Sequence, residues 1–366
     1  MTRGQKKALL ILAKIIFGGG LIAFVALQLV KEWPKVSGSI ISAFTNHPGS
    51  LVLGLLLFTG VYILGNARWL LLLWPHRIHL SFRSASKLWF IGHFFAQYMP
   101  GGIAGGDGIK AWYVGTHPKS IGRCAEAVST VFLDRFLGII GLIGVLLIAV
   151  VINLQQSAAY QKYWLYALAL LLGVGLTLVL LFNKTLVKKL PLVMRMYMRL
   201  PYREQVKRVY DAFHFYRNRP GELGAAFGLS LLVHTTTAFE AYLFGSALGL
   251  EYTFPEYLLL LSLMNFVASI PISPVGNVGT LEASCVFFFG QGSAERSALA
   301  LALALLIRSA YLLWGIPGLV LYVTHRKEMP HEPAEETAEI IAHEDDLQPE
   351  APPSAGALMK EAATDD

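Results

Sequence analysis

The sequence predicts an all-α, polytopic membrane protein with about six full transmembrane helices and two re-entrant hairpins, each broken by glycine and proline, in an inverted-topology repeat. Three observations predict this fold class: the apolar composition, the lengths of the apolar segments, and a Gly-rich motif that occurs twice. Apolar residues make up 55% of the chain against 15% charged residues, and the mean hydropathy is +0.53. An average soluble domain is far less apolar.

Six apolar segments are long enough, or nearly so, to cross a bilayer. About 30 Å of hydrocarbon requires roughly 20 apolar residues in a helix. The first segment has 23 residues behind a basic start, and a cleavable signal peptide has only roughly 7–15, so we expect an uncleaved first helix. The six expected crossings are 8–30, 51–74, 136–154, 163–182, 223–250 and 297–324.

A Pro-x-Gly-x-x-Gly motif begins at Pro100 and again at Pro274. Each copy follows an apolar stretch too short to cross a bilayer, 88–99 and 257–270. Each copy is also followed by a carboxylate and then by an arginine in an apolar helix: Asp107 and Arg135 after the first, Glu282 and Arg308 after the second. Repeated broken helices with buried charges are typical of transporters.

The two prolines are expected to stop the incoming half-helices, since proline lacks an N–H donor and clashes with the preceding turn. The glycines then let the chain reverse. We expect the second half-helices to start near Asp107 and near Thr280, where free N–H groups and the helix dipole would attract an anion. The alternative is that the glycines serve tight helix packing alone.

Lysine and arginine mark the cytoplasmic loops. The expected external loops, 31–50, 153–162 and 251–256, together hold three lysines and no arginine. This bias places both termini in the cytoplasm. The expected location of the protein is the cytoplasmic (inner) membrane. Unit A, about 51–152, and unit B, about 223–324, then contain the same elements in opposite orientation. A pseudo-two-fold axis in the membrane plane would relate them.

The charges divide the chain into an integral membrane domain, 1–327, and an acidic tail, 328–366. The tail holds 12 of the 24 acidic residues and one basic residue, so the membrane domain carries 29 − 12 = +17. The tail is expected to be disordered and cytoplasmic. The basic segment 183–220 is expected to lie on the anionic cytoplasmic surface. Nucleic-acid binding is not expected, and the sequence leaves the oligomeric state open.

Charged groups inside a membrane are costly and usually face a partner or a watery path. Asp134 and Arg135 are expected to pair with other elements, whereas Arg68 is expected to snorkel to the cytoplasmic end of its helix. For the carboxylates and arginines, structural bracing and contact with substrate or a coupling ion both stay open. The expected translocation path comprises Pro100, Gly101, Gly102, Gly105, Gly106, Asp107, Lys110, Glu126, Asp134, Arg135, Glu240, Pro271, Ser273, Pro274, Gly276, Gly279, Glu282 and Arg308.

These residues resemble a known family. The chain is similar to the flippase-like membrane family named after the transmembrane region of lysylphosphatidylglycerol synthase, over roughly residues 8–325. The resemblance rests on Pro100-Gly101-Gly102-x-x-Gly105-Gly106-Asp107, on Asp134-Arg135, and on Ser269-x-Pro271-x-Ser273-Pro274-x-Gly276-x-x-Gly279-x-x-Glu282.

The resemblance implies a polytopic domain that moves a lipid, often an aminoacylated phospholipid or a polyprenyl-linked sugar. Two features depart from the family pattern. A 39-residue tail stands where the synthase subgroup has a soluble aminoacyl-transferase domain, so lipid aminoacylation by this stand-alone chain is not expected. Gly276-Asn277 also replaces the usual paired glycine of the second motif.

The expected function is a lipid translocase that moves an anionic phospholipid or a polyprenyl-linked lipid between leaflets by alternating access. Lys110, Arg135 or Arg308 would bind the lipid phosphate. Two alternatives stay open: an ion-coupled secondary transporter of a small solute, with Asp107, Asp134 and Glu282 carrying protons, and a membrane-embedded glycosyl or lipid transferase. The sequence has no recognisable catalytic domain, catalytic residues, metal site, cofactor site or ATP-binding motif.

Overall fold

The computed structural model describes residues 3–99, 102–116, 124–154, 215–269 and 277–324, with a few single residues between 165 and 176. Contacts divide the chain into two units, Met1–Met329 and Pro330–Asp366, and the second unit lies wholly outside the described residues. Several expectations also fall outside them: Pro100, Gly101, Pro271, Ser273, Pro274 and Gly276, most of the expected helix 163–182, the segment 183–214 and the tail 328–366.

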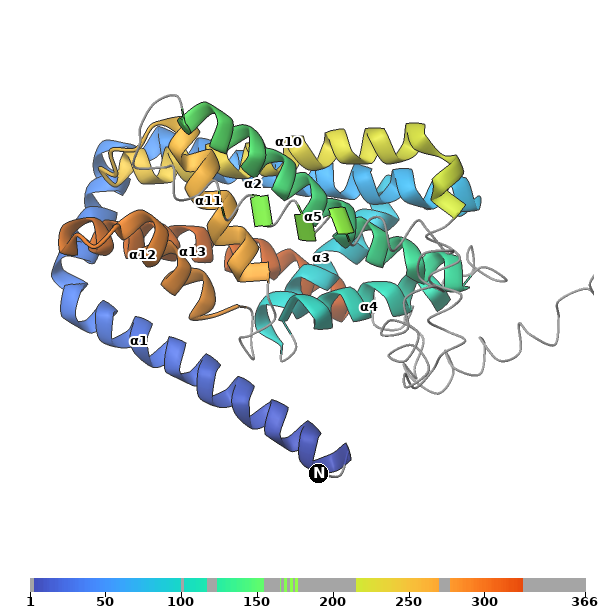
Figure 1. Ribbon diagram of the computed structural model, residues 1–366, viewed down its shortest axis with the longest axis horizontal. Coiled ribbons are helices and arrows are strands. Elements are labelled where there is room, and N and C mark those ends of the chain that lie inside the picture. The colour runs from blue at the N-terminus through green and yellow to red at the C-terminus, as the bar shows by residue number, and fades with distance from the viewer. Residues whose placement is uncertain are drawn as a thin grey trace, which may run out of the picture. The chain divides into compact units, whose positions relative to one another are not determined.

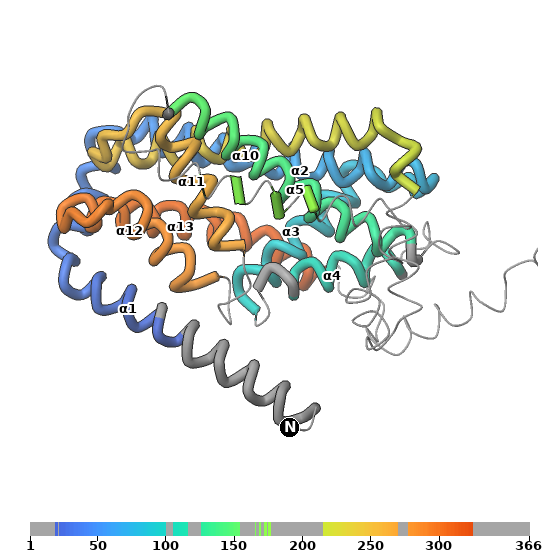
Figure 2. The backbone as a smooth tube through the Cα atoms, in the orientation of Figure 1, coloured from blue at the N-terminus to red at the C-terminus, as the bar shows by residue number. Residues whose placement is uncertain are grey.

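All regular structure in the described residues is helical, which confirms the all-α fold class (Figure 1). The backbone tube in Figure 2 follows the same helices in chain order. They are α1 (Arg3–Asn46), α2 (Pro48–Leu73), η1 (Trp74–His76), α3 (Phe82–Tyr98), α4 (Gly102–Thr116), α5 (Cys124–Leu154), η4 (Tyr216–Asn218), α10 (Pro220–Ala247), α11 (Phe254–Ser269), α12 (Thr280–Gly290) and α13 (Ala294–Thr324).

Three stretches of the described chain are long and apolar enough to cross a membrane: Pro48–His76, Glu126–Asn153 and Ala294–Thr324. They correspond to α2 with η1, to most of α5, and to α13. The helix α10 has a comparable length of 28 residues. However, it carries Glu222, His234 and Glu240, and no stretch of it is as apolar as those three. The membrane helices are therefore confirmed, whereas the count of six crossings stays a prediction.

Two pairs of short helices occupy the positions of the Gly-rich motifs. In the first pair, the Ser81 side chain caps α3 by accepting the Ser84 N–H, and α3 ends at an extended residue, Met99. The next helix, α4, starts at Gly102. The expected start near Asp107 is therefore wrong, because the five residues from Gly102 to Gly106 continue the helix despite three glycines.

The second pair of short helices follows the prediction more closely. After α11, the chain passes through Asn277 and Gly279, whose φ angles of 56° and 83° are left-handed. Glycine adopts such an angle without steric cost, and asparagine tolerates it better than most residues. The helix α12 then starts at Thr280, as expected. At 11 residues, α12 is too short to cross a bilayer.

The packing of α3 on α4 depends on Gly106. A methyl group at this position would overlap the carbonyl oxygen of Gly92 and lie 2.8 Å from Cβ of Ala96. Gly108, one half-turn further along α4, is exposed and has no atom within 4 Å of the corresponding position. The two arms of the first broken pair can therefore approach only because residue 106 has no side chain.

We expect Gly106→Ala to lower the free energy of unfolding by about 1–3 kcal/mol, the usual cost of forcing an extra methyl group into a packed interface. The matched control, Gly108→Ala, should be neutral or stabilising by up to about 1 kcal/mol, because alanine is the better helix former. Thermal unfolding of the detergent-solubilised variants measures both effects. Equal stability of the two variants would contradict this packing.

Candidate functional site

Asp134 on α5 is the centre of a buried charged cluster. Its Oδ1 accepts a hydrogen bond of 2.8 Å from Nε of Arg68 on α2, and its Oδ2 lies 3.9 Å from Nζ of Lys110 on α4. A second guanidinium nitrogen of Arg68 donates to Oγ of Ser230 on α10, also over 2.8 Å. All four side chains are buried. The cluster therefore joins four helices through one carboxylate.

The position of Arg68 corrects the expectation that this side chain snorkels to the membrane surface. Arg68 is 6% exposed and turns inward. A charge-assisted hydrogen bond to a buried carboxylate is roughly twice as strong as a neutral one. Gly138 provides the space, because a Cβ atom there would lie 3.3 Å from the guanidinium group. In the sequence, only the presence of an arginine in the apolar segment 51–74 indicated this buried cluster. Nothing in the sequence indicated that Ser230 takes part in it.

Lys110 is held by two indole rings as well as by Asp134. Its Nζ lies 3.8 Å from the ring centroid of Trp69 and 4.0 Å from that of Trp89. Both distances are within cation–π range. Trp69 is itself fixed, because its Nε1 donates to Oγ1 of Thr130 over 3.1 Å. Lys110 is thus enclosed on three sides within the protein.

Arg135, next to Asp134 in the chain, pairs with a different partner. Its Nε lies 2.6 Å from Oδ2 of Asp107 on α4, and a second guanidinium nitrogen donates to Oδ1 over 2.7 Å. This two-point geometry fixes the plane of the guanidinium group. The Arg135 side chain is nevertheless 47% exposed. Arg135 is therefore a cation held in a fixed orientation, with part of its side chain still accessible.

Arg308 on α13 forms the corresponding pair with Glu282 on α12. Its Nε donates to Oε1 of Glu282 over 2.8 Å, and its side chain is only 9% exposed. Two further hydrogen bonds reach the breaks in the short helices: one of 3.1 Å to the carbonyl oxygen of Asn277 and a long one of 3.5 Å to Oε1 of Gln97 near the end of α3. Arg308 therefore lies where the two broken pairs meet.

Glu282 also stabilises the start of its own helix. Its Oε2 accepts the backbone N–H of Gly279 over 2.7 Å, which satisfies a group that would otherwise be buried without a partner at the helix terminus. One carboxylate thus neutralises Arg308 and caps α12. The sequence predicts Glu282 and Arg308 as partner candidates, but it does not reveal this double role.

Aromatic side chains fill the region between α2, α3 and α13. The Tyr62 ring stacks on Phe90 at 5.3 Å, and its edge contacts with Phe58 and His93 are both at 5.1 Å. His93 is fixed by a 2.8 Å hydrogen bond between Nε2 and the carbonyl oxygen of Tyr311. These contacts form a packed aromatic wall that joins α2, α3 and α13.

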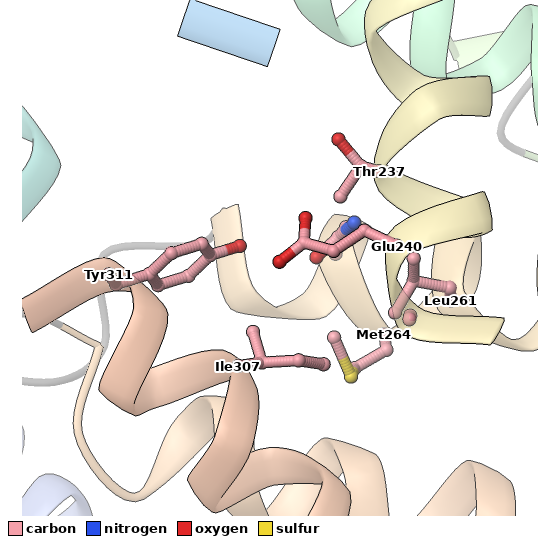
Figure 3. A pocket seen from close by; sticks show the side chains of 8 residues that line it. Thr237, Glu240, Leu261, Met264, Ile307 and Tyr311 are labelled. Atoms are coloured by element: carbon pink, nitrogen blue, oxygen red, sulfur yellow. The ribbon is translucent and has the colours of Figure 1, made fainter. Parts of the chain in front are cut away.

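The remaining predicted site residues form no ion pairs with other described residues. Glu240 on α10 is buried and lines a small pocket (Figure 3). Glu126 is half-buried and forms no ion pair with any other described residue. Gly102, Gly105 and Gly106 lie in α4, and Gly279 precedes α12. The pocket of Glu240 was not expected from the sequence.

Searches of curated proteins and of solved structures gave no match. The model of one family, described as the lysylphosphatidylglycerol synthase TM region, matches residues 11–318. The match covers both broken helix pairs and all the ion pairs described above. The chain therefore belongs to the lysylphosphatidylglycerol synthase transmembrane-region family, a family of membrane domains with lipid-related function.

Proposed function

We propose that this protein is a membrane lipid translocase that moves an anionic phospholipid or a polyprenyl-linked lipid between leaflets. The observation that carries the proposal is Arg135, a half-exposed arginine in a membrane-length helix, held in a fixed orientation by Asp107. A charged group in a membrane helix is costly unless it faces a partner or a polar path. The planar donor fork of arginine matches the oxygens of a lipid phosphate.

The other cations are less suited to contact with a substrate. Arg68 and Lys110 are buried and bonded to Asp134, and Arg308 is buried and bonded to Glu282. Bringing a phosphate to any of them would break a buried charged contact, which is costly. Arg135 can keep Asp107 and still present its open side. A headgroup at Arg135 with acyl or prenyl chains in the bilayer therefore fits the site best.

Helix packing supports the inverted repeat that alternating access requires. Exchanging α2 with α10, α3 with α11, α4 with α12 and α5 with α13 maps most of the helix contacts of one half onto those of the other, although α5 packs on α10 and α2 has no comparable contact with α13 among the described residues. Under this exchange, the contact of α3 with α13 becomes that of α11 with α5, and α2 packs on α10 across the proposed axis. The Asp107–Arg135 pair corresponds to the Glu282–Arg308 pair, and the partners are 28 and 26 residues apart.

The two ion pairs differ in one respect that a transport cycle would use. Arg135 is 47% exposed, whereas Arg308 is 9% exposed. In a cycle of alternating access, one half of the site is open while the other is closed. We assign this conformation to a state with the α4–α5 side open. The proposal also includes re-entrant hairpins, six crossings, cytoplasmic termini, an inner-membrane location and a basic surface segment at 183–220.

We expect Arg135→Gln to slow lipid translocation about 10-fold to 100-fold, because a hydrogen bond to a charged group contributes about 1.5–3 kcal/mol. The rate is measured in proteoliposomes that contain fluorescent phosphatidylglycerol or a labelled polyprenyl phosphate. The signal is the fraction of dye that becomes accessible to an external quencher over time. The matched control is Arg296→Gln, since Arg296 is exposed at the start of α13.

Three outcomes would contradict the proposal. In the first, the wild-type protein moves neither anionic probe. In the second, Arg135→Gln and Arg296→Gln translocate lipid equally fast. In the third, the protein takes up a small solute along a pH gradient and moves no lipid, which would favour the solute-transporter alternative. The thermal unfolding midpoint of Arg135→Gln, compared with that of the wild-type protein, shows whether a slower rate reflects an unfolded variant.

A further inference from the structure

We propose that Glu240 is the proton-carrying group that couples lipid translocation to a proton gradient. The inference rests on the proposed translocase function and adds its energy source. Glu240 lies on α10 and is 2% exposed. Its Oε1 is buried and has no hydrogen-bond partner among the described residues. An isolated carboxylate in such a place is very unfavourable, and a buried acid of this kind takes up a proton instead.

The surroundings of Glu240 are polar but uncharged. Thr237 lies one turn earlier on α10, Asn265 comes from α11, and Tyr311 comes from α13. The apolar residues Leu261, Met264 and Ile307 close the rest of the pocket. Figure 3 shows the Glu240 carboxyl group and the Tyr311 hydroxyl group pointing toward each other. The pocket leaves no room for a water molecule, so hydration cannot stabilise a charged form.

The titratable groups that face Glu240 come from two helices. Tyr311 on α13 and Tyr62 on α2 both lie within electrostatic range of its carboxyl group. Arg308, on the same helix as Tyr311, is bonded to Glu282. Among the described residues, no lysine, arginine or histidine nitrogen lies within 4 Å of the Glu240 carboxyl oxygens. Phenol groups are neutral near pH 7, so nothing in this environment compensates a negative charge on Glu240.

Three further carboxylates in the membrane helices are less suitable proton carriers. Asp107 is paired with Arg135, Asp134 with Arg68 and Lys110, and Glu282 with Arg308. Each of these three carboxylates therefore has a cation beside it that balances its charge. Glu240 is therefore the fully buried acid of the described membrane helices that lacks a cationic partner, whereas Glu126, which also has none among the described residues, is only half-buried. In the solute-transporter alternative, by contrast, Asp107, Asp134 and Glu282 would carry the protons.

The coupling step requires no redox change. In the closed pocket, Glu240 holds the proton on its carboxyl group. When α10, α11 and α13 separate, water reaches the carboxyl group, the O–H bond breaks, and the proton leaves as hydronium while the carboxylate is hydrated. Closure of the pocket requires the carboxylate to take a proton back. If the pocket opens to opposite sides in alternate states, one proton crosses in each cycle.

Infrared difference spectra test the proton site without any transport assay. We expect the carboxylic-acid carbonyl band of wild-type protein at neutral pH to include a component that Glu240→Gln removes. Glu222→Gln, which replaces a half-buried acid paired with Arg219 at the start of the same helix, should leave that component in place. Since glutamine copies the shape and neutrality of a protonated glutamate, Glu240→Gln should also fold normally. Identical carbonyl bands in Glu240→Gln and wild-type protein would overturn the proton site.

Coupling is tested in proteoliposomes that contain fluorescent phosphatidylglycerol and carry an imposed pH difference. One proton per lipid gives an equilibrium leaflet ratio that shifts about tenfold for each pH unit. We expect this shift with wild-type protein and with Glu222→Gln. Glu240→Gln should exchange lipid without any pH-driven asymmetry.

The two tests separate the two proposals. A wild-type protein that moves lipid with no response to the pH difference would overturn the coupling alone. A Glu240→Gln variant that kept the tenfold shift would overturn it as well. A wild-type protein that moves no lipid at all would overturn the translocase, and with it the coupling, while the infrared result would still decide whether Glu240 holds a proton.

Discussion

Replacing Asp134 with alanine is expected to destabilise the protein by about 3–5 kcal/mol, because two buried cations, Arg68 and Lys110, lose their shared carboxylate. Their attraction to Asp134 offsets the cost of removing both cations from water. The indole rings of Trp69 and Trp89 continue to contact Lys110, but no other carboxylate contacts Arg68 among the described residues. Thermal unfolding in detergent should show a midpoint lowered on the order of 10 °C.

Asp107→Ala is the matched control for this loss of stability. Asp107 also pairs with an arginine of α5, but that arginine is half exposed and can be solvated when the carboxylate is removed. The expected cost is no more than about 1 kcal/mol, as for ion pairs near a surface. The double variant Asp134→Ala with Arg68→Ala should regain part of the loss. Equal destabilisation by Asp134→Ala and Asp107→Ala would show that burial does not distinguish the two pairs.

Glu282→Ala is expected to cost a comparable amount, about 3–5 kcal/mol, since it leaves Arg308 buried without its carboxylate and removes the cap of α12. Glu282→Gln separates the two roles. Glutamine retains an oxygen that can accept the Gly279 N–H, so this variant should lose the ionic contribution and keep the cap. The measurement is again the unfolding midpoint in detergent, with Glu282→Ala, Glu282→Gln and Arg308→Ala compared.

The double variant Glu282→Ala with Arg308→Ala provides the test of coupling between these partners. Its loss of stability should be smaller than the sum of the two single losses, because the second substitution removes the cation that the first one left unpaired. Strict additivity would mean that the 2.8 Å contact between Nε of Arg308 and Oε1 of Glu282 contributes nothing to stability.

The sequence predicts the helical class, the two broken helix pairs and the family membership. These predictions succeed because proline, glycine and apolar length act locally, so one segment alone carries the signal. It also predicts that Asp134 and Arg135 pair with other elements, since adjacent residues on a helix point about 100° apart. The contacts in the structure agree, with Arg68 and Lys110 at Asp134 and Asp107 at Arg135.

Errors arise where the outcome depends on a distant neighbour. The direction of Arg68 is set by Asp134, 66 positions away, and by the space at Gly138. The start of α4 is set by packing at Gly106, which keeps glycines helical where local propensity favours a loop. The partners of Arg308 at Gln97 and Asn277 are 211 and 31 positions away. No periodicity in one segment can reveal these contacts.

The hydrogen bonds of Arg308 also determine where the two halves can separate with least cost. Among the described residues, its bonds to Glu282 and Asn277 stay within the C-terminal half, and only the 3.5 Å bond to Gln97 reaches the other half. Separating the halves at Arg308 stretches this long contact and leaves Arg308 paired with Glu282. Shorter hydrogen bonds of 2.8 Å also cross between the halves, among them Arg68 to Ser230, His93 to Tyr311 and Tyr98 to Leu312. Resistance to separation therefore comes from these hydrogen bonds together with the shape fit of the aromatic side chains around Tyr62. Such resistance varies with temperature and membrane thickness, and only slightly with ionic strength.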